Sequence, residues 1–221
     1  MNKISKRLNF ISDLVDKKIV CDVGCDHGKL INYLFENNKI TFAYVSDISM
    51  PSLNKAINLL SYGKYKFDWI HCDGLSGYSD KSVEQCIISG MGGDEIIKII
   101  DNSPIEINSF ILSPQHNNID VKRYMLSKSY NIVFDMIIED KGKFYNILKF
   151  EKSDNIEDLS EFDLYFGHDN FINESSQIDK YIISEIKKTE NLLEMVNESR
   201  KEELLKYLEL LQIAKKRRML L

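Results

Sequence analysis

Short apolar runs alternate with segments of helical apolar spacing over roughly the first 150 residues. The runs predict strands at 19–20, 42–45, 67–70, 85–88 and 110–112. Apolar residues three or four apart predict helices over 4–14, near 30–34, and over 50–60, 94–103 and 120–127. Two last strands, 132–138 and 144–150, flank a turn and should pair as an antiparallel hairpin. This alternation predicts an α/β fold, a doubly wound Rossmann-like parallel sheet with an antiparallel edge.

The pattern changes after residue 152. Residues 153–170 are acidic and aperiodic, and we interpret them as an irregular connector. Beyond it, two helical stripes end in Val196 and Leu211, and Ser199-x-x-Glu202 has the form of a capping box that would restart a helix after a break near Asn197. We therefore predict three parts: a domain over 1–152, a connector over 153–170 and an α-helical coiled-coil hairpin over 171–221. Two antiparallel helices are favoured over one long rod.

Composition removes several classes of function. The 221 residues carry a net charge of −5, which excludes a uniformly basic nucleic-acid binder but not a local basic patch. Four scattered cysteines, without a C-x-x-C pair or companion histidines, support neither a metal site nor a disulfide framework. No segment resembles a signal peptide or a membrane span, so we expect a cytoplasmic protein without membrane contact. Nothing in the sequence indicates an oligomeric state.

The most informative segment is Asp22-Val23-Gly24-Cys25-Asp26-His27-Gly28, between a predicted strand and a predicted helix. Such a turn presents free backbone N–H groups at a helix N-terminus. Its G-x-x-x-G spacing matches neither the dinucleotide fingerprint nor the P-loop. An acid two residues before the first glycine is instead a signature of S-adenosylmethionine enzymes. It can order the loop or hold the amino-acid end of the cofactor. A purely structural turn is the alternative.

Further polar groups follow the next three predicted strands. Asp47 is placed to bind ribose hydroxyls, Asp73 is placed to accept the adenine amino group, and a second glycine turn spans 90–93. Each acid could instead cap the following helix. Taken together, the strand ends predict a site for S-adenosyl-L-methionine. The expected cofactor-binding residues are Asp22, Gly24, Cys25, Asp26, Asp47, Ile48, Asp73 and Gly74.

These segments, with Ser89-Gly90-Met91-Gly92-Gly93 and Glu139-Asp140-Lys141-Gly142-Lys143-Phe144-Tyr145, resemble the bacterial tRNA adenine-N1 methyltransferases that modify adenine 22 in the D-arm. The resemblance implies a class I methyltransferase sheet followed by a coiled-coil domain, S-adenosylmethionine as cofactor and tRNA as substrate. The chain departs from the family at Ser113-Pro114-Gln115, where Gln-Pro is expected, and has an inserted lysine in the turn near 141. We therefore assign no role to Gln115 from sequence.

Methylation of adenine N1 requires an extruded base but no prior loss of a proton, because the N1 lone pair is free in the neutral base. An acceptor at the N6 amino group would stabilise the positive charge that the base gains. The candidate catalytic acceptors are the carbonyls of Gly90, Met91 and Gly92 and the carboxylate of Asp26. Asp26 could equally hold the amino group of the cofactor.

Three residues are expected to contact the substrate. His27 could stack on the target base or cap the following helix, and Lys6 and Arg7 on the opening helix could contact phosphate. The basic run Lys215-Lys216-Arg217-Arg218 suggests a polyanion partner for the hairpin, against a solvated tail or a role in oligomerisation. Two other functions remain open, a small-molecule methyltransferase and a non-catalytic RNA-binding protein. The second would be expected to have lost Asp47 and Asp73.

Overall fold

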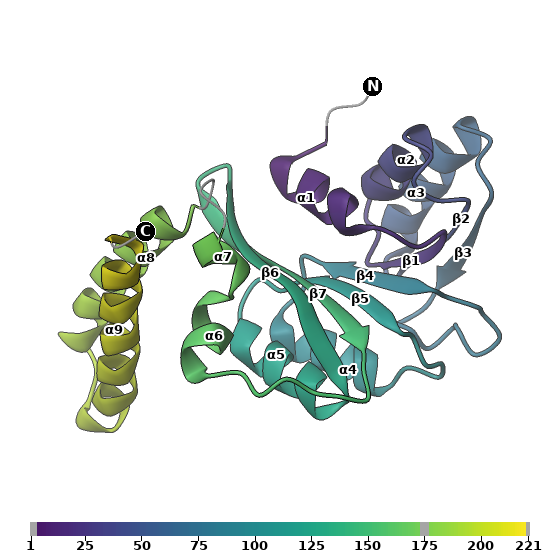
Figure 1. The fold of residues 1–221 in the computed structure, drawn as a ribbon. Helices are drawn as coiled ribbons and strands as arrows, with labels where there is room; N and C mark the ends of the chain where they lie inside the picture. The colour runs from purple at the N-terminus through teal and green to yellow at the C-terminus, as the bar shows by residue number, and fades with distance from the viewer. Residues whose placement is uncertain (1–3, 173–176, 220–221) are drawn as a thin grey trace.

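In the computed structural model, which describes residues 4–172 and 177–219, the strands form one twisted sheet (Figure 1). The strands are β1 (Ile19–Val23), β2 (Phe42–Asp47), β3 (Phe67–His71), β4 (Gln85–Ser89), β5 (Ser109–Ser113), β6 (Tyr130–Asp140) and β7 (Lys143–Lys152). Their order across the sheet is β3-β2-β1-β4-β5-β7-β6. Strands β1 to β5 are parallel, and β7 pairs antiparallel with both β5 and β6. The predicted doubly wound sheet with an antiparallel edge is confirmed.

Helices cover both faces of this sheet. The helices are α1 (Lys6–Leu14), α2 (Lys29–Glu36), α3 (Met50–Tyr62), α4 (Gly93–Asp101), α5 (Asn118–Ser127), α6 (Glu161–Phe166), α7 (Asp169–Ile172), α8 (Ile178–Leu193) and α9 (Glu198–Met219). Helices α1, α2 and α3 pack on one face and α4 and α5 on the other. In β4, for example, Ile87 joins the first core and Cys86 and Ile88 join the second. Central strands buried on both faces explain the continuous apolar runs of the sequence.

Helix α3 shows how local sequence fixes the loops that follow the strands. Ser49 is its N-cap and accepts from the Ser52 N–H at 3.4 Å, and Pro51 lies in the first turn, where its missing N–H costs no hydrogen bond. Because the cap follows directly on β2, the chain turns sharply at the carboxyl edge of the sheet. Asp47 is held at that turn.

The segment 153–170 is not the irregular connector expected from its acidity. It contains α6 and the start of α7, and α6 begins with a capping box between Ser160 and Asp163. Its aromatic side chains Phe162, Phe166 and Phe171 pack on one another with ring centroids 5.0 to 5.3 Å apart. Among the acids that suggested an irregular connector, Asp163 therefore takes part in a helix cap, while Phe162, Phe166 and Phe171 pack into a core.

This segment also covers the outer edge of β6. Three backbone N–H groups of β6, two residues apart, donate to side chains: Asp135 to Asp169 (2.7 Å), Ile137 to Asn170 (2.9 Å) and Glu139 to Gln177. An edge strand otherwise presents such donors as a template for another chain. Side chains therefore take the place of a further strand.

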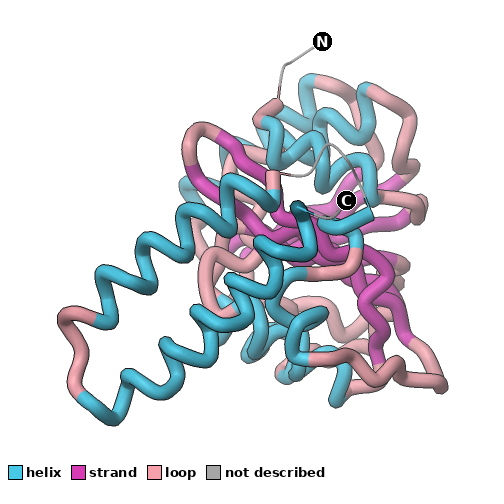
Figure 2. The backbone as a smooth tube through the Cα atoms, turned by 60° about the vertical axis from the view of Figure 1, so that its left-hand side comes forward, coloured by secondary structure: helices cyan, strands magenta, loops and turns pink. Residues whose placement is uncertain are grey.

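The two last helices form the predicted antiparallel hairpin (Figure 2). An ion pair of 3.1 Å joins Arg218 near the end of α9 to Asp179 at the start of α8. The predicted capping box at Ser199 is wrong: its hydroxyl donates to Asn197, and Glu202 accepts from Lys206. Glu202 therefore forms an ion pair with Lys206 on the surface of the helix and does not cap it.

The base of the hairpin is part of a third core. This core joins α8 and α9 to the edge strand and the α6–α7 segment through Ile137, Phe166, Phe171, Ile178, Ile182, Leu211 and Ala214. The distal part of the hairpin projects away from the sheet (Figures 1 and 2). The hairpin is consequently not structurally independent of the first domain.

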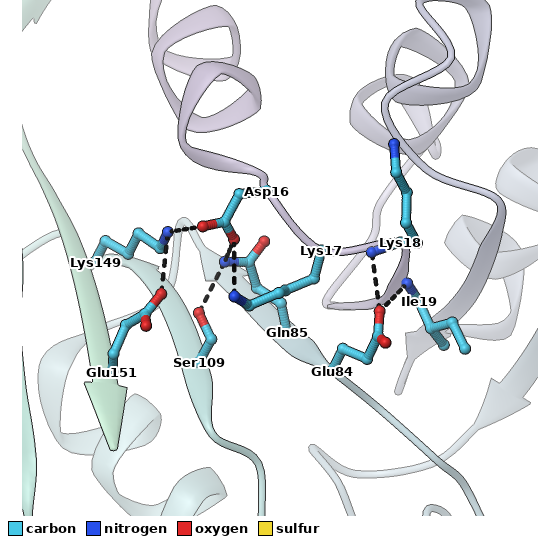
Figure 3. A network of polar contacts seen from close by, with 9 residues as sticks. All are labelled: Asp16, Lys17, Lys18, Ile19, Glu84, Gln85, Ser109, Lys149 and Glu151. Carbon is cyan, nitrogen blue, oxygen red and sulfur yellow. Dashed lines mark hydrogen bonds and ion pairs between the residues drawn. The ribbon is translucent and has the colours of Figure 1, made fainter. Parts of the chain in front are cut away.

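A polar network at the amino edge of the sheet fixes the chain between α1 and β1 (Figure 3). The Asp16 carboxylate accepts from Lys149 on β7 at 2.7 Å and from Gln85 on β4 at 3.3 Å. The Glu84 carboxylate accepts the backbone N–H groups of Lys18 and Ile19. The chain between α1 and β1 is thereby tied to β7 and to the start of β4.

A buried ion pair beneath α6 yields a stability prediction. Lys122 Nζ lies 2.5 Å from Asp135 Oδ2, with side-chain exposures of 1% and 5%, and it also donates to the Leu164 carbonyl at 2.7 Å. Lys122→Met should lower the free energy of unfolding by about 3–5 kcal/mol, because Asp135 stays buried without a counter-charge. Urea denaturation measures the loss.

A matched control is Lys128→Met, which breaks an ion pair with Asp101 of 2.8 Å whose side chains are 49% and 54% exposed. That change should cost less than about 1 kcal/mol. Equal losses in the two variants would show that the Lys122 pair does not anchor the C-terminal segment.

Candidate active site

The predicted site residues meet at the carboxyl edge of the parallel strands. The chain runs outward from β1 through β2 and β3 and then returns to β4 on the other side of β1. The loops after β1 and β4 therefore diverge and leave a crevice, which is where open α/β sheets bind ligands. The loops after β2 and β3 extend this crevice along the same edge. The structure thus brings together four segments that are spread over about 70 residues of sequence.

The glycine turn after β1 is anchored on β2. The N–H groups of Gly24 and Cys25 both donate to the Ser46 carbonyl, at 2.9 and 3.0 Å. Gly24 has a φ of 72°, and a Cβ there would clash with the methyl group of Met91. Gly28 has a φ of 66°, and its Cβ would lie 2.9 Å from that of Ala56. Both glycines are therefore required by backbone conformation and close approach.

Asp47 joins the loops after β1 and β2. Its Oδ2 accepts the Asp26 N–H at 3.1 Å and its Oδ1 accepts the Ser49 N–H at 2.8 Å. A carboxylate has about four lone-pair positions, so two acceptor positions remain for a ligand. Asp47 can therefore both hold the two loops together and bind ribose hydroxyls.

Asp26 and His27 form a pair at the rim of the crevice. The distance from Asp26 Oδ2 to His27 Nδ1 is 2.6 Å, and the side chains are 69% and 40% exposed. Helix α2 has Gly28 as its N-cap and no side-chain capping bond, so the capping alternative for His27 is wrong. Asp26 has a left-handed φ of 48°, and its carboxylate faces solvent.

Asp22 is the buried acid of the site. Burial, followed by the charges of Asp47 and Asp26, raises the pKa of this carboxyl to about 7. Burial and the same acids also raise the pKa of the Cys25 thiol, so Cys25 offers its backbone and not a thiolate. A cavity of about 100 Å³ is lined by Asp22, Gly24, Asp26 and His27. A cationic group in this cavity would relieve the crowding of negative charge.

A second cavity, of about 250 Å³, opens further along the edge between the loop after β3 and α4. Its lining includes Asp73, Leu75 and Ile48, the last with 68% exposure despite its apolar side chain. Gly74 has a φ of 58°, and its Cβ would lie 2.8 Å from the Ile99 side chain. An apolar wall beside an exposed carboxylate suits a purine with an amino group.

The carbonyls of Gly90, Met91 and Gly92 are already engaged. They accept from Gln115 Nε2 at 2.5 Å, from the Gln115 N–H at 2.9 Å and from the Ile96 N–H at 3.0 Å. Each carbonyl therefore has one lone pair left for a substrate. Sequence reasoning assigned no role to Gln115. Its position directly after a parallel strand was the available signal.

Only one of the two basic candidates on α1 reaches the site. Arg7 lines the smaller cavity, and its guanidinium lies 4.9 Å from the ring centroid of Tyr145. The backbone N–H of Arg7 donates to the Asp140 carboxylate. Lys6 is exposed and lines neither cavity. Tyr145 and Asp140 are residues whose part in the site was not predicted.

Comparisons with known proteins agree with this geometry. The family model described as "Methyltransferase domain" matches residues 4–148. A Mycoplasma genitalium protein named "Putative tRNA methyltransferase MG248" is 33% identical over 67% of this chain and 70% of its own length. The Bacillus subtilis tRNA (adenine(22)-N(1))-methyltransferase is 25% identical over 69% of this chain and 66% of its own length. The structure of Streptococcus pneumoniae Sp1610 in complex with S-adenosyl-L-methionine has a TM-score of 0.84 and 27% identity over 96% of this chain and 100% of that chain.

The strand order, the glycine turn and the acids at successive strand ends define a class I S-adenosylmethionine-dependent methyltransferase. The chain belongs to the methyltransferase-domain family, alongside the tRNA methyltransferases to which it is similar. Over residues 4–172 and 177–219, no helix is long and apolar enough to cross a membrane. The same described residues contain no group of three or more His, Cys, Asp or Glu side chains arranged to hold a metal ion.

The raised pKa of Asp22 predicts a pH dependence. The native state keeps this proton up to about pH 7, whereas the ordinary carboxyl value is 3.8. Between these values the native state binds more protons than the unfolded chain, so stability falls as pH rises. Asp22→Asn should therefore be more stable than the natural protein by a margin that grows from pH 4 to 7 and reaches the order of 4 kcal/mol.

Cofactor binding should follow the opposite trend, because only the ionised carboxyl attracts an ammonium group. Calorimetry should show affinity for S-adenosylmethionine rising from pH 5.5 to 7.5 in the natural protein and remaining flat in Asp22→Asn. A parallel rise in both proteins would assign the dependence to another group.

Proposed function

We propose that this protein transfers a methyl group from S-adenosylmethionine to N1 of an adenine in tRNA, at position 22. The observation that carries the proposal is the crevice at the carboxyl edge, where successive strand ends carry Asp22, Gly24, Asp47 and Asp73. Support comes from the Bacillus subtilis relative, named for adenine 22, and from the Streptococcus pneumoniae structure with S-adenosyl-L-methionine. Because the substrate is tRNA, we place the protein in the cytoplasm.

Different side chains bind different parts of the cofactor. Asp22 holds the amino group, and the N–H groups of the loop after β1 surround the carboxylate end. Asp47 binds the ribose hydroxyls through the lone pairs that Asp26 and Ser49 leave open. Asp73 and Ile48 hold the adenine in the larger cavity. When bound, S-adenosylmethionine supplies an electrophilic methyl group on a sulfonium.

The rim residues act on the target base. The base must leave its stack, at a cost of a few kcal/mol, before N1 can face the methyl group. Asp26 is the exposed acid at the open end of the cavity and accepts from the N6 amino group as the base becomes positive. His27 orients the Asp26 carboxylate through their 2.6 Å contact. Arg7, supported by the ring of Tyr145, binds a phosphate beside the extruded nucleotide.

Transfer of a labelled methyl group to bulk tRNA that lacks this modification tests the proposal. Nucleoside analysis should yield 1-methyladenosine, and sequencing should place it at adenine 22. Label on another nucleoside would refute the assigned position on the base. Absence of label on any tRNA, with S-adenosylmethionine bound, would refute the substrate.

A substitution at Asp26 distinguishes a role in methyl transfer from a role in cofactor binding. If it serves the methyl transfer, Asp26→Asn should lower kcat by at least tenfold and change the Kd for S-adenosylmethionine by less than twofold, since only interactions formed in the transition state act on kcat. Single-turnover kinetics and calorimetry measure the two quantities. A parallel loss of both would make Asp26 a cofactor ligand.

The C-terminal hairpin is proposed as a second contact surface for tRNA. Residues 178–219 contain ten Lys and Arg and eight Asp and Glu residues, which gives a small positive charge against −5 for the whole chain. Of the four cations at its end, Arg218 pairs with Asp179, and Arg217 lies 5.2 Å from the ring centroids of Phe162 and Phe171. Lys215 and Lys216 are exposed and are the better candidates for phosphate contacts.

Truncation near residue 160 would be a poor test of this surface, because it removes the side chains that cover β6. The double variant Lys215→Glu/Lys216→Glu leaves the fold intact. It should weaken tRNA binding and lower the slope of log affinity against log salt by about two. Cofactor affinity should not change.

The matched control is Lys55→Glu/Lys66→Glu, with the same change of charge on exposed positions of α3 and the start of β3. It should bind tRNA more tightly than the hairpin variant, with a steeper salt slope. If the two double variants behave alike, the effect is one of net charge and the hairpin has another purpose, such as oligomerisation.

A further inference from the structure

The side chain of Gln115 is exposed, yet a hydrogen bond to the loop after β4 holds its amide. Gln115 follows β5, and its Nε2 donates to the Gly90 carbonyl at 2.5 Å while its N–H donates to the Met91 carbonyl at 2.9 Å. The Gly90 N–H in turn donates to the Ser113 carbonyl at 3.1 Å. The loops after β4 and β5 are therefore closed on each other, with this amide at their junction.

Gly90 lies between that amide and the side chain of Arg7. Its φ is 91°, and an added Cβ would make ordinary contacts, 3.7 Å from Arg7 Nη1 and 4.0 Å from Gln115 Nε2. Arg7 also lines the cavity that contains Asp22, Gly24 and Asp26. Gln115 is consequently close, through Gly90 and Arg7, to the proposed cofactor site.

The chemistry of a primary amide fits one edge of adenine. The glutamine amide has two N–H donors and one carbonyl acceptor, and Gly90 uses one donor. One N–H and Oε1 remain, which match the N7 acceptor and the N6 donor of adenine, a pairing that glutamine makes in nucleic-acid recognition. This edge lies on the other side of the N6 amino group from N1. Gln115 can therefore hold the base while N1 stays open to the methyl group.

We propose that Gln115 is the residue that selects adenine, by accepting from N6 and donating to N7 of the extruded base. The inference rests on the proposed methylation of adenine N1 and adds the recognition of the base. Guanine would place its O6 acceptor against the Oε1 acceptor, so the same amide orientation rejects it. The Gly90 carbonyl is what prevents the amide from turning over to accommodate guanine.

The test uses tRNA with a single 7-deazaadenosine at the target position, which removes the N7 acceptor and leaves N1 and N6 in place. For the natural protein, kcat/KM should fall roughly 10- to 100-fold on this tRNA. For Gln115→Ala, kcat/KM should fall by a similar factor on ordinary tRNA. On the 7-deaza tRNA, kcat/KM of this variant should fall by less than a further twofold. The substrate control carries 7-deazaadenosine at a different adenine and should be methylated at the ordinary rate.

The proposal is overturned if Gln115→Ala and the 7-deaza substitution lower kcat/KM independently, so that their effects multiply. An ordinary kcat/KM for Gln115→Ala would also overturn it. Gln115→Met retains the length of the side chain and should reproduce the Ala result. Unchanged S-adenosylmethionine affinity and thermal midpoint would exclude a folding defect as the cause. A natural protein that methylates no tRNA adenine would refute the proposed function, whereas methylation without coupling to N7 would refute this inference alone.

Discussion

Strands β1 and β2 end at the same level of the sheet, with Val23 opposite Ser46, and the loops that follow share their hydrogen bonds. The Ser46 carbonyl accepts two N–H groups of the glycine turn and the Asp47 carboxylate accepts a third. The turn has no freedom to open once these bonds form. It therefore holds Asp26 in a left-handed conformation and brings three carboxylates, those of Asp22, Asp26 and Asp47, close together. The site carries an electrostatic penalty that a cationic ligand removes.

The other rim of the crevice depends on the antiparallel edge of the sheet. The β6–β7 hairpin supplies Asp140 and Tyr145, which fix the start of α1 and the position of Arg7. Strand β6 is also where the C-terminal helices attach, through Asp169, Asn170 and the third core. One pair of strands thus connects the substrate rim with the proposed tRNA surface.

The sequence predicted those features that depend on neighbours in the chain. The apolar runs of the strands, the glycine turn and the acids at strand ends need only a few adjacent residues to be recognised. The features that it missed are long-range. The acidic residues of 153–170 favoured an irregular segment, so α6 was not predicted. The aromatic residues of α6 are buried only because β6 offers an edge. Ser199 and Glu202 have the spacing of a cap, but Lys206 competes for the carboxylate. Gln115 acquires a role only when β4 and β5 lie side by side.

The environments of Asp22 and Asp26 divide two tasks that the sequence could not separate. Asp22 is 5% exposed at the floor of the cavity, where burial makes its charge costly unless a cation is bound. Asp26 is exposed at the rim, and its carboxylate contacts His27. In the proposed reaction, positive charge moves from the sulfonium to the base, while Asp22 stays beside the amino group of the cofactor. A carboxylate of Asp26 beside the base would then stabilise the product charge more than the charge of the bound cofactor, which is the condition for lowering the barrier.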